Sequence, residues 1–223
     1  MTNREDKYRT AAFFDLDLTI TDRDCFHYFL AVYHFSKLTK WIYIPWVLIF
    51  GVLRKLRIIS LQTFKEKALI SLVGKSETSI RQIGKPFIEK HLLNIIRERA
   101  LHKIRQHKEL GHFTFIITSC PDIYIVSLAE YLECDGIECS RLAYRNSKFI
   151  GKILGRDCFG SEKVRRLKVL VENSALDLSR SYAYSDHQSD LPLLEMVGRP
   201  VAVTPTEQLR RIAIDRGWEI EEW

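Results

Sequence analysis

The strongest constraint on this chain is a short apolar run that ends in two carboxylates. Residues 11–14 are wholly apolar, as is typical of a strand that is covered on both faces of a parallel sheet. Asp15 and Asp17 follow at once, and Thr19 stands two positions later. Ligands of open α/β sheets bind at the carboxyl ends of strands, so these side chains are candidates for chemistry. An isolated Asp-x-Asp pair is more often a solvated loop, and the remaining sequence has to supply partners for it.

The second half of the chain alternates between strand and helix patterns. Strands are expected at residues 113–117, 136–140, 181–184 and 200–203. Helices are expected at residues 122–132, 161–171, 191–196 and 206–216. A polar hairpin is expected over residues 142–154, with its turn at Asn146 and Ser147. This alternation predicts an α/β fold, a Rossmann-like, doubly wound parallel sheet with helices on both faces.

The segment between the first strand and this alternating region has only helical patterns. Helices are expected at residues 24–37, 60–73 and 76–93, and a further helix spans 96–110 and stops at Gly111. We therefore predict a core formed by residues 1–20 and 101–223. Residues 21–100 would form an all-helical insertion after the first strand.

Basic charge is concentrated in that insertion. Residues 21–100 contain 14 Lys and Arg against 6 Asp and Glu, whereas the rest of the chain contains 20 and 22. Such an excess favours contact with something anionic. A solvated helical face rich in Lys and Arg explains the excess equally well.

An uncharged stretch within the insertion has bases on both sides. Residues 41–53 carry no charge, and the flanking bases are Lys37, Lys40, Arg54, Lys55 and Arg57. Thirteen residues are too few to span a bilayer, which needs about 20. The pattern favours a helix lying on an anionic membrane surface over the alternative, the core of a small helical bundle.

Cysteine use and the first residues bear on location. The five cysteines are an odd number without a Cys-x-x-Cys pair, which predicts reduced thiols in a cytosolic protein. Residues 1–10 are polar and mixed in charge, unlike a signal or transit peptide. The expected location is cytoplasmic, with peripheral contact on the inner face of the cell membrane.

Three later elements carry polar residues of the kinds that complete a phosphate site. Thr118 and Ser119 follow an expected strand, and a hydroxyl and a backbone N–H there can bind phosphate oxygens. Lys163 lies near the start of an expected helix. Asp186 and Asp190 follow the strand at 181–184. Each feature is weak alone, but their order on successive strand ends is specific.

With these residues in order, the sequence resembles the haloacid-dehalogenase-like (HAD) superfamily of phosphatases over essentially the whole chain. Residues 15–19 are similar to its first motif, Thr118 to its second, Lys163 to its third, and Asp186 with Asp190 to its fourth. The insertion is similar to the C1 cap of that superfamily. Leu18 departs from the pattern, because the family usually has Gly there.

The finer pattern is similar to the phosphoserine-phosphatase-like branch, subfamily IB. The residues that carry this similarity are 118–121, 158–164, 184–186, 190–194 and 203–205. Within that branch the chain most resembles the phosphatidylglycerophosphatase C enzymes, which also have an apolar, basic cap segment.

The resemblance implies hydrolysis of a phosphomonoester through an aspartyl-phosphate. Asp15 would be the nucleophile and Asp17 the general acid and base. Mg²⁺ would be held by the Asp15 carboxylate, the Asp17 backbone carbonyl and Asp186, with waters completing an octahedron. Asp190 would orient the metal waters or Lys163.

Thr118 and the Ser119 N–H would hold phosphate oxygens in such a site. Lys163 would offset the negative charge gathered between Asp15, the phosphate and Asp186.

Two substrates fit this reading. The apolar, basic insertion favours a phospholipid, phosphatidylglycerophosphate. A small soluble phosphate such as phosphoserine is the alternative, because Asp24 stands where the phosphoserine phosphatases have an acidic residue that contacts substrate. Against it, the Gly-Gly that follows the second motif in those enzymes is replaced by Ser119 and Cys120.

Another class of function is a non-catalytic phosphoaspartate switch or a module that binds an anionic surface. Receiver-type switches lack a large cap and the acid at the position of Asp17. Nucleic acid is not expected as a partner, because aromatic residues at helical spacing are better explained by packing or lipid than by base stacking.

Overall fold

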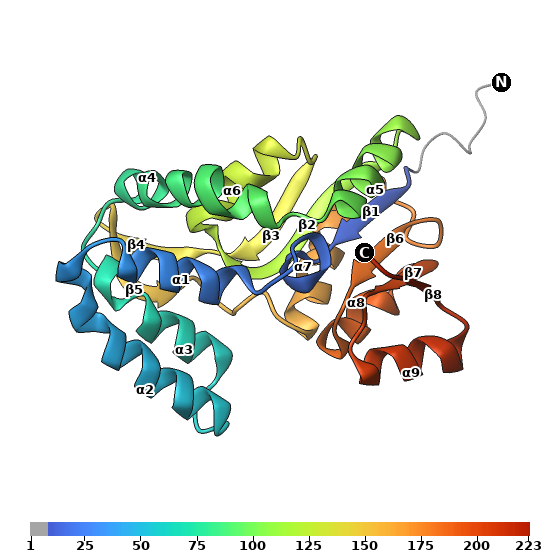
Figure 1. The fold of residues 1–223 in the computed structure, drawn as a ribbon. Coiled ribbons are helices and arrows are strands. Elements are labelled where there is room, and N and C mark those ends of the chain that lie inside the picture. The colour runs from blue at the N-terminus through green and yellow to red at the C-terminus, as the bar shows by residue number, and fades with distance from the viewer. Residues whose placement is uncertain (1–8) are drawn as a thin grey trace.

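Six parallel strands form the central sheet in the order β3-β2-β1-β6-β7-β8 (Figure 1). Their bounds are β1 Ala11–Phe14, β2 Phe113–Pro121, β3 Gly136–Ser140, β6 Tyr182–Ser185, β7 Arg199–Val203 and β8 Glu219–Glu221. The structure is a computed structural model that describes residues 9–223. The expectation that residues 1–10 are not a targeting segment therefore falls almost wholly outside the described residues.

Strand β1 lies at the point where the strand order reverses. It pairs with β2 on one side, Phe14 opposite Ile116, and with β6 on the other, Phe14 opposite Tyr184. Connections leave this point toward opposite edges of the sheet, which opens a crevice at the carboxyl ends of β1 and β6. Asp15 follows β1 and Asp186 follows β6, so the fold brings these two residues to the same crevice.

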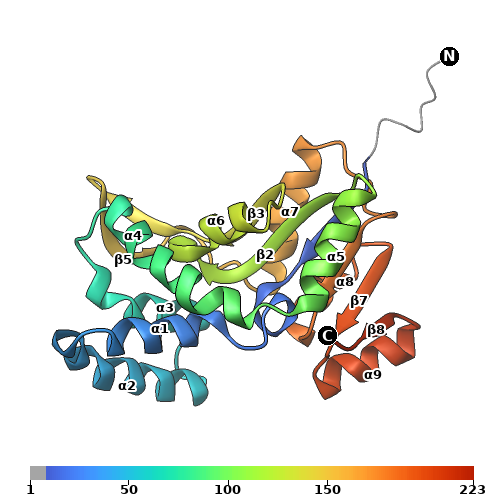
Figure 2. The same ribbon diagram turned by 45° about the horizontal axis from the view of Figure 1, so that its top comes forward.

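Helices cover both faces of the sheet, as the alternating pattern predicts. They are α5 Glu98–Glu109, α6 Asp122–Tyr131, α7 Ser161–Asn173, α8 Leu191–Leu194 and α9 Glu207–Arg216. Successive residues of β1 alternate between two buried clusters: Phe14 joins the cluster with Ile104 of α5, and Phe13 joins the cluster with Leu167 of α7. Figure 2 shows α5 in front of the sheet and α7 behind it. The doubly wound α/β fold is confirmed.

A two-stranded antiparallel hairpin stands apart from the main sheet. It comprises β4 Leu142–Arg145 and β5 Lys148–Ile153, and its turn lies at Asn146 and Ser147 as expected.

Two strand predictions need correction. Strand β2 continues to Pro121, so Thr118 and Ser119 lie inside the strand and not beyond its end; an irregularity in the pairing with β3 between Ile117 and Pro121 lets the strand bend and continue. Strand β8 was not expected, because its three residues include two glutamates. Short strands with charged residues are common at sheet edges, and they do not show the apolar alternation by which a strand is recognised in a sequence.

The helical insertion, residues 21–100, contains four α-helices and no named strand, as expected. They are α1 Cys25–Phe35, α2 Ile44–Lys55, α3 Leu61–Ala68 and α4 Glu77–Phe87. The helix expected over 76–93 ends earlier, at Phe87, where Pro86 precedes a π-helical turn, Ile88–Leu92, and a 3-10 turn, Leu93–Ile95.

The insertion packs directly on the core of the sheet. Phe29 of α1 and Phe87 of α4 contact Tyr124 of α6, with ring centroids 5.3 and 5.1 Å apart. Helix α4 approaches α6 so closely that a Cβ at Gly84 would lie 2.1 Å from the Ile123 carbonyl oxygen. Only glycine fits at this contact. These contacts join the insertion to the helix layer of the core.

The apolar stretch at residues 41–53 is not the core of a bundle. No residue of α2, or of the 3-10 helix Leu38–Tyr43 before it, is buried. We call the exposed large apolar side chains here the apolar surface: Leu38, Trp41, Ile42, Trp46, Leu48, Ile49, Val52, Leu56 and Ile58. Among the described residues, no helix has the length and apolar character needed to cross a membrane.

Candidate active site

A cavity of about 180 Å³ opens at the carboxyl ends of β1, β2 and β6, beneath the helical insertion. We call it the strand-end cavity. Of the residues expected at the site, those that line it are Asp15, Asp17, Asp24, Ser119, Lys163, Asp186 and Asp190. Thr118 is the one expected residue that does not line it, because its side chain is completely buried behind the wall.

The turn after β1 positions both carboxylates of the first motif. The Asp15 N–H donates to the Tyr184 carbonyl at 3.0 Å, which extends the pairing with β6 by one residue. The Thr21 N–H and hydroxyl both donate to the Leu16 carbonyl, at 3.0 Å each, and close a tight turn. Within it Leu18 has φ +60°, a left-handed conformation that costs a non-glycine residue roughly 1–2 kcal/mol. This is a physical reason for the glycine that the family usually has at this position.

A buried lysine joins two of the carboxylates. The Lys163 Nζ lies 2.6 Å from Asp15 Oδ1 and 2.6 Å from Asp190 Oδ2. Lys163 is the third residue of α7, and the Ser185 hydroxyl, at the end of β6, donates to the same Asp190 oxygen at 2.8 Å. Asp190 therefore fixes the ammonium against Asp15.

The carboxylates that line this cavity outnumber its cations, and the pKa values of Asp15 and Asp186 are raised. Burial raises the pKa of Asp15 well above its usual range, and the charges of Asp190, Asp17 and Asp186 add to the rise, although Lys163 opposes it. Burial, with the charge of Asp190, raises the pKa of Asp186 to about 7. Burial lowers the pKa of Lys163, but Asp15 and Asp190 more than offset this, so its pKa is raised. A further cation would relieve the repulsion.

Asp17 has its own set of donors on the side that faces the insertion. The Cys25 N–H donates to Asp17 Oδ1 at 2.7 Å, and the Cys120 thiol donates to Oδ2 at 3.2 Å. Burial raises the pKa of Asp17, and the nearby charge of Asp24 raises it further. A raised pKa is the direction of shift that a general acid needs.

The oxygen atoms here fit a hard divalent cation. Asp186 Oδ1 accepts a long 3.4 Å bond from the Thr19 hydroxyl, and Asp190 Oδ1 is buried without a hydrogen-bond partner in the described part of the chain. Among those residues, no three His, Cys, Asp or Glu side chains are grouped to hold a metal. A site built from two carboxylates, a backbone carbonyl and waters does not need such a group, and Mg²⁺ usually keeps several waters.

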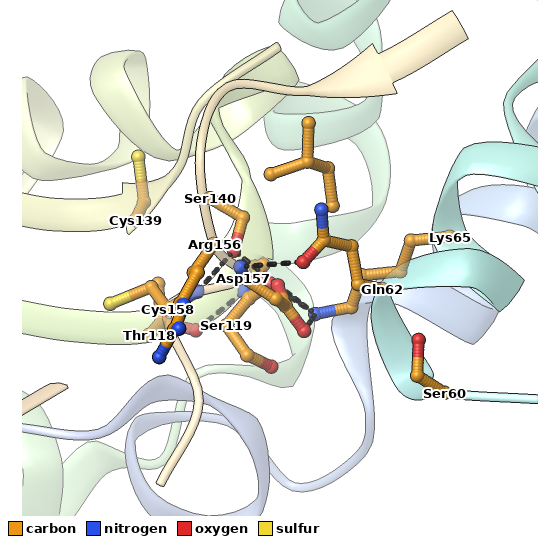
Figure 3. Close-up of polar contacts among 12 residues, drawn as sticks. Ser60, Gln62, Lys65, Thr118, Ser119, Cys139, Ser140, Arg156, Asp157 and Cys158 are labelled. Carbon is orange, nitrogen blue, oxygen red and sulfur yellow. Dashed lines mark hydrogen bonds and ion pairs between the residues drawn. The ribbon is translucent and has the colours of Figure 1, made fainter. Parts of the chain in front are cut away.

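The wall at the end of β2 is held by a residue of the insertion (Figure 3). Lys65 of α3 donates to the Ser119 carbonyl and to both oxygens of Asp157, at 2.9 and 3.0 Å. Asp157 also accepts from the Ser140 hydroxyl. The Thr118 hydroxyl accepts from the Cys120 N–H at 3.1 Å. This buried network fixes the backbone on which Ser119 presents its N–H.

Sequence reasoning missed three residues at this site: Lys65, His27 and Cys120. Lys65 is only 2% exposed, yet it belongs to a basic segment that looks solvated in the sequence. His27 lines the cavity beside Asp24, which caps α1 by accepting from the His27 N–H at 2.7 Å and pairs with the ring Nδ1 at 2.9 Å. An Asp three residues before a His at the start of an expected helix is the sequence signal that predicts this contact.

Comparisons with known proteins agree with this geometry. Phosphoserine phosphatase SerB1 of Mycobacterium tuberculosis is 28% identical over 159 residues, which cover 71% of this chain and 52% of that protein. The chain thus spans about half the length of that relative. The inhibition of morphological differentiation protein of Streptomyces azureus is 28% identical over 220 residues, covering 95% of this chain and 78% of that protein.

Solved structures share the fold. A Bordetella pertussis protein of unknown function superposes with a TM-score of 0.87 at 24% identity, covering 96% of this chain and 98% of that one. A phospho-aspartyl intermediate analogue of phosphoserine phosphatase superposes with a TM-score of 0.66 at 17% identity, covering 96% and 93%. The model of the haloacid dehalogenase-like hydrolases matches residues 12–195. The chain belongs to the haloacid dehalogenase-like hydrolase family.

Proposed function

We propose that this protein is a Mg²⁺-dependent phosphomonoesterase that works through an aspartyl-phosphate on Asp15. The observation that carries the proposal is the pairing of Lys163 with Asp15 and Asp190, with Asp17 in the same cavity. Lys163 holds the Asp15 carboxylate and opposes the rise in its pKa, whereas Asp17 accepts from the Cys25 N–H and the Cys120 thiol. A nucleophile and an acid with different environments are what a two-step phosphoryl transfer requires.

In the first step, Asp15 forms a bond to phosphorus as the bond to the leaving oxygen breaks. Asp17 gives its proton to that oxygen, so the product leaves as a neutral alcohol. In the second step, Asp17 takes a proton from the water that attacks phosphorus, and Asp15 is released with inorganic phosphate. Mg²⁺, held by the Asp15 carboxylate, the Asp17 carbonyl and Asp186, would supply charge neutralisation at the phosphoryl oxygens.

The phosphate itself would be held by groups on the core. The Ser119 N–H is proposed to bind a phosphoryl oxygen, and Lys163 to stabilise the phosphoryl charge. The sequence prediction that Thr118 binds phosphate is not carried over, because its side chain is enclosed behind the cavity wall and its hydroxyl accepts from the Cys120 N–H. Asp190 positions Lys163 through the 2.6 Å contact between its Oδ2 and the ammonium. The helical insertion, residues 21–100, is proposed to act as a C1 cap over a core of residues 1–20 and 101–223.

For the substrate we propose phosphatidylglycerophosphate, dephosphorylated at the cytoplasmic face of a membrane. Support comes from the apolar surface, where Leu48 and Ile42 are 63% and 78% exposed, and from the bases on either side of it. An exposed apolar area with a basic rim suits adsorption to anionic lipid. The sequence resemblance of the apolar, basic insertion to the cap segment of the phosphatidylglycerophosphatase C enzymes points the same way.

Phosphoserine is the second candidate. Asp24 lines the strand-end cavity, where it can meet the amine of a small amino-acid phosphate. The name of the SerB1 relative also favours this substrate. A non-catalytic phosphoaspartate switch is disfavoured, because Asp17 lies where it can activate the hydrolytic water.

A phosphate-release panel with and without Mg²⁺ decides among these. The assay compares micellar phosphatidylglycerophosphate, phosphatidic acid, phosphoserine and p-nitrophenyl phosphate. We expect the highest kcat/KM for phosphatidylglycerophosphate, and loss of all activity when EDTA removes the metal. A preference for phosphoserine over both lipids would replace the proposed substrate, and full activity in EDTA would contradict the metal site.

Membrane contact has a separate test by co-sedimentation with vesicles. The protein is expected to bind vesicles that contain anionic phosphatidylglycerol, and binding should weaken as salt rises, since screening reduces attraction to basic residues. Replacing Ile42 and Val52 by glutamate should lower binding at least about tenfold, because each charge opposes burial in the interface. The matched change Ile214→Glu, on exposed α9, should leave binding unchanged. Equal binding by the wild type, the Ile42 and Val52 double variant and the Ile214→Glu control would contradict the role of the apolar surface.

A further inference from the structure

A second cavity, also of about 180 Å³, lies between α1 and α2. We call it the α1/α2 groove. Its walls are Leu30, His34 and Phe35 of α1 and Ile44, Val47 and Leu48 of α2. It is not a sealed packing defect, because Phe35 and Leu48 are 62% and 63% exposed and form an open edge beside the apolar surface.

The groove and the strand-end cavity meet at one residue. His27 lines both of them. From His27 to Phe35 the groove follows eight residues of α1, or about 12 Å at 1.5 Å per residue. The groove therefore begins at the residue that also forms part of the wall of the strand-end cavity, and it runs toward the apolar surface.

His27 makes this junction polar. Its Nδ1 lies 2.9 Å from Asp24 Oδ1, and its ring stacks on Phe64 with centroids 5.5 Å apart. The hydrogen bond to Asp24 raises the pKa of His27, although burial opposes the rise. The side chain remains 61% exposed, so the ring is accessible to a ligand group placed between the cavity and the groove.

We propose that the α1/α2 groove is the subsite for an acyl chain of the substrate, and that His27 pairs with a second anionic group between that chain and the scissile phosphate. The ligand class is an acylated phospholipid whose phosphomonoester enters the strand-end cavity. This subsite rests on the proposed phosphatase function and deepens it. A substrate without an acyl chain leaves the groove empty.

His34 adds a second polar contact inside the groove. It lies seven residues after His27, two turns along the same face of α1. His34 is 3% exposed, and neither ring nitrogen makes a hydrogen bond of regular geometry among residues 9–223, although backbone groups of Lys40 and Ala68 lie near the ring. Burial lowers the pKa of His34, and a neutral imidazole has one N–H to donate. The ester carbonyl that joins an acyl chain to glycerol is a suitable acceptor.

Monomeric substrates test the subsite without a membrane. The assay compares kcat/KM for dihexanoyl phosphatidylglycerophosphate, below its critical micelle concentration, with that for the same headgroup after both acyl chains are removed. The wild-type protein is expected to favour the acylated compound at least tenfold. Leu48→Glu, which places a charge at the open edge of the groove, should reduce this preference to about twofold or less. Ile214→Glu, at an equally exposed apolar site on α9, should retain it.

A second variant tests the junction. His27→Gln should lower kcat/KM for both phosphodiester-containing compounds at least about tenfold more than it lowers kcat/KM for p-nitrophenyl phosphate, since that ester has no second anion. Ala31→Trp fills the groove from an exposed position of α1 and should reproduce the effect of Leu48→Glu if the glutamate variant fails to fold.

Outcomes separate this proposal from the proposed function. Hydrolysis of p-nitrophenyl phosphate with equal kcat/KM for the acylated and deacylated compounds overturns the subsite alone. An unchanged preference in the Leu48 and Ala31 variants does the same. Absence of hydrolysis of every ester tested removes the phosphatase proposal and the subsite with it.

Discussion

Asp15→Asn is expected to lower phosphate release by roughly 10⁴-fold or more, because an amide cannot serve as the nucleophile and no second carboxylate takes its place. The substitution preserves the size of the side chain. Burial already penalises the charge of Asp15, so a neutral residue should not destabilise the fold. The measurement is initial-rate phosphate release with Mg²⁺, alongside thermal unfolding to show that the variant is folded.

A matched control is available on the surface of the same segment. Asp22 is an exposed aspartate that pairs with Arg23 at 2.8 Å, outside the strand-end cavity. Asp22→Asn should retain full activity. A folded Asp15→Asn variant that works within tenfold of the wild type would remove Asp15 from the chemistry.

Lys163→Met is expected to damage both stability and activity. The change leaves Asp15 and Asp190 buried without their shared cation, and breaking a buried pair in this way costs about 3–5 kcal/mol. Loss of the charge beside the phosphate should lower kcat by roughly 10²–10³-fold. Chemical denaturation measures the first effect and phosphate release the second.

A double variant separates these two effects. Adding Asp190→Asn to Lys163→Met removes one uncompensated carboxylate, so part of the lost stability should return while activity stays low. Lys168→Met, at an exposed position of the same helix, should change neither quantity. Normal activity in a stable Lys163→Met protein would contradict the proposed role of this lysine.

The core of the site could be predicted because its residues follow local patterns. The apolar strand ahead of Asp15 and the strand ahead of Asp186 each end at the same edge of one sheet, and parallel strands leave no other place for their next residues. The position of Lys163 near a helix start could be predicted because the helical pattern of the sequence begins at Ser161, which is where α7 begins. Asp190 could be placed near the cavity, but its bond to Lys163 emerges only in three dimensions.

The parts that escaped prediction depend on long-range packing. Lys65 looked like one base among many until α3 brought it against Ser119, which is 54 residues away in the chain. Thr118 was expected after a strand that in fact continues past it, so its side chain is enclosed. The α1/α2 groove depends on how two helices of the insertion lie against each other, which apolar periodicity does not specify.

The most direct measurement is detection of the phosphoenzyme. The wild-type protein is mixed with a radiolabelled phosphomonoester and Mg²⁺, turnover is stopped with acid within the first cycles, and the labelled peptide is mapped by mass spectrometry. We predict an acyl phosphate on Asp15 that hydroxylamine releases and that the Asp15→Asn variant does not form. Sustained hydrolysis with no labelled protein, or label on another residue such as His187, would contradict the account.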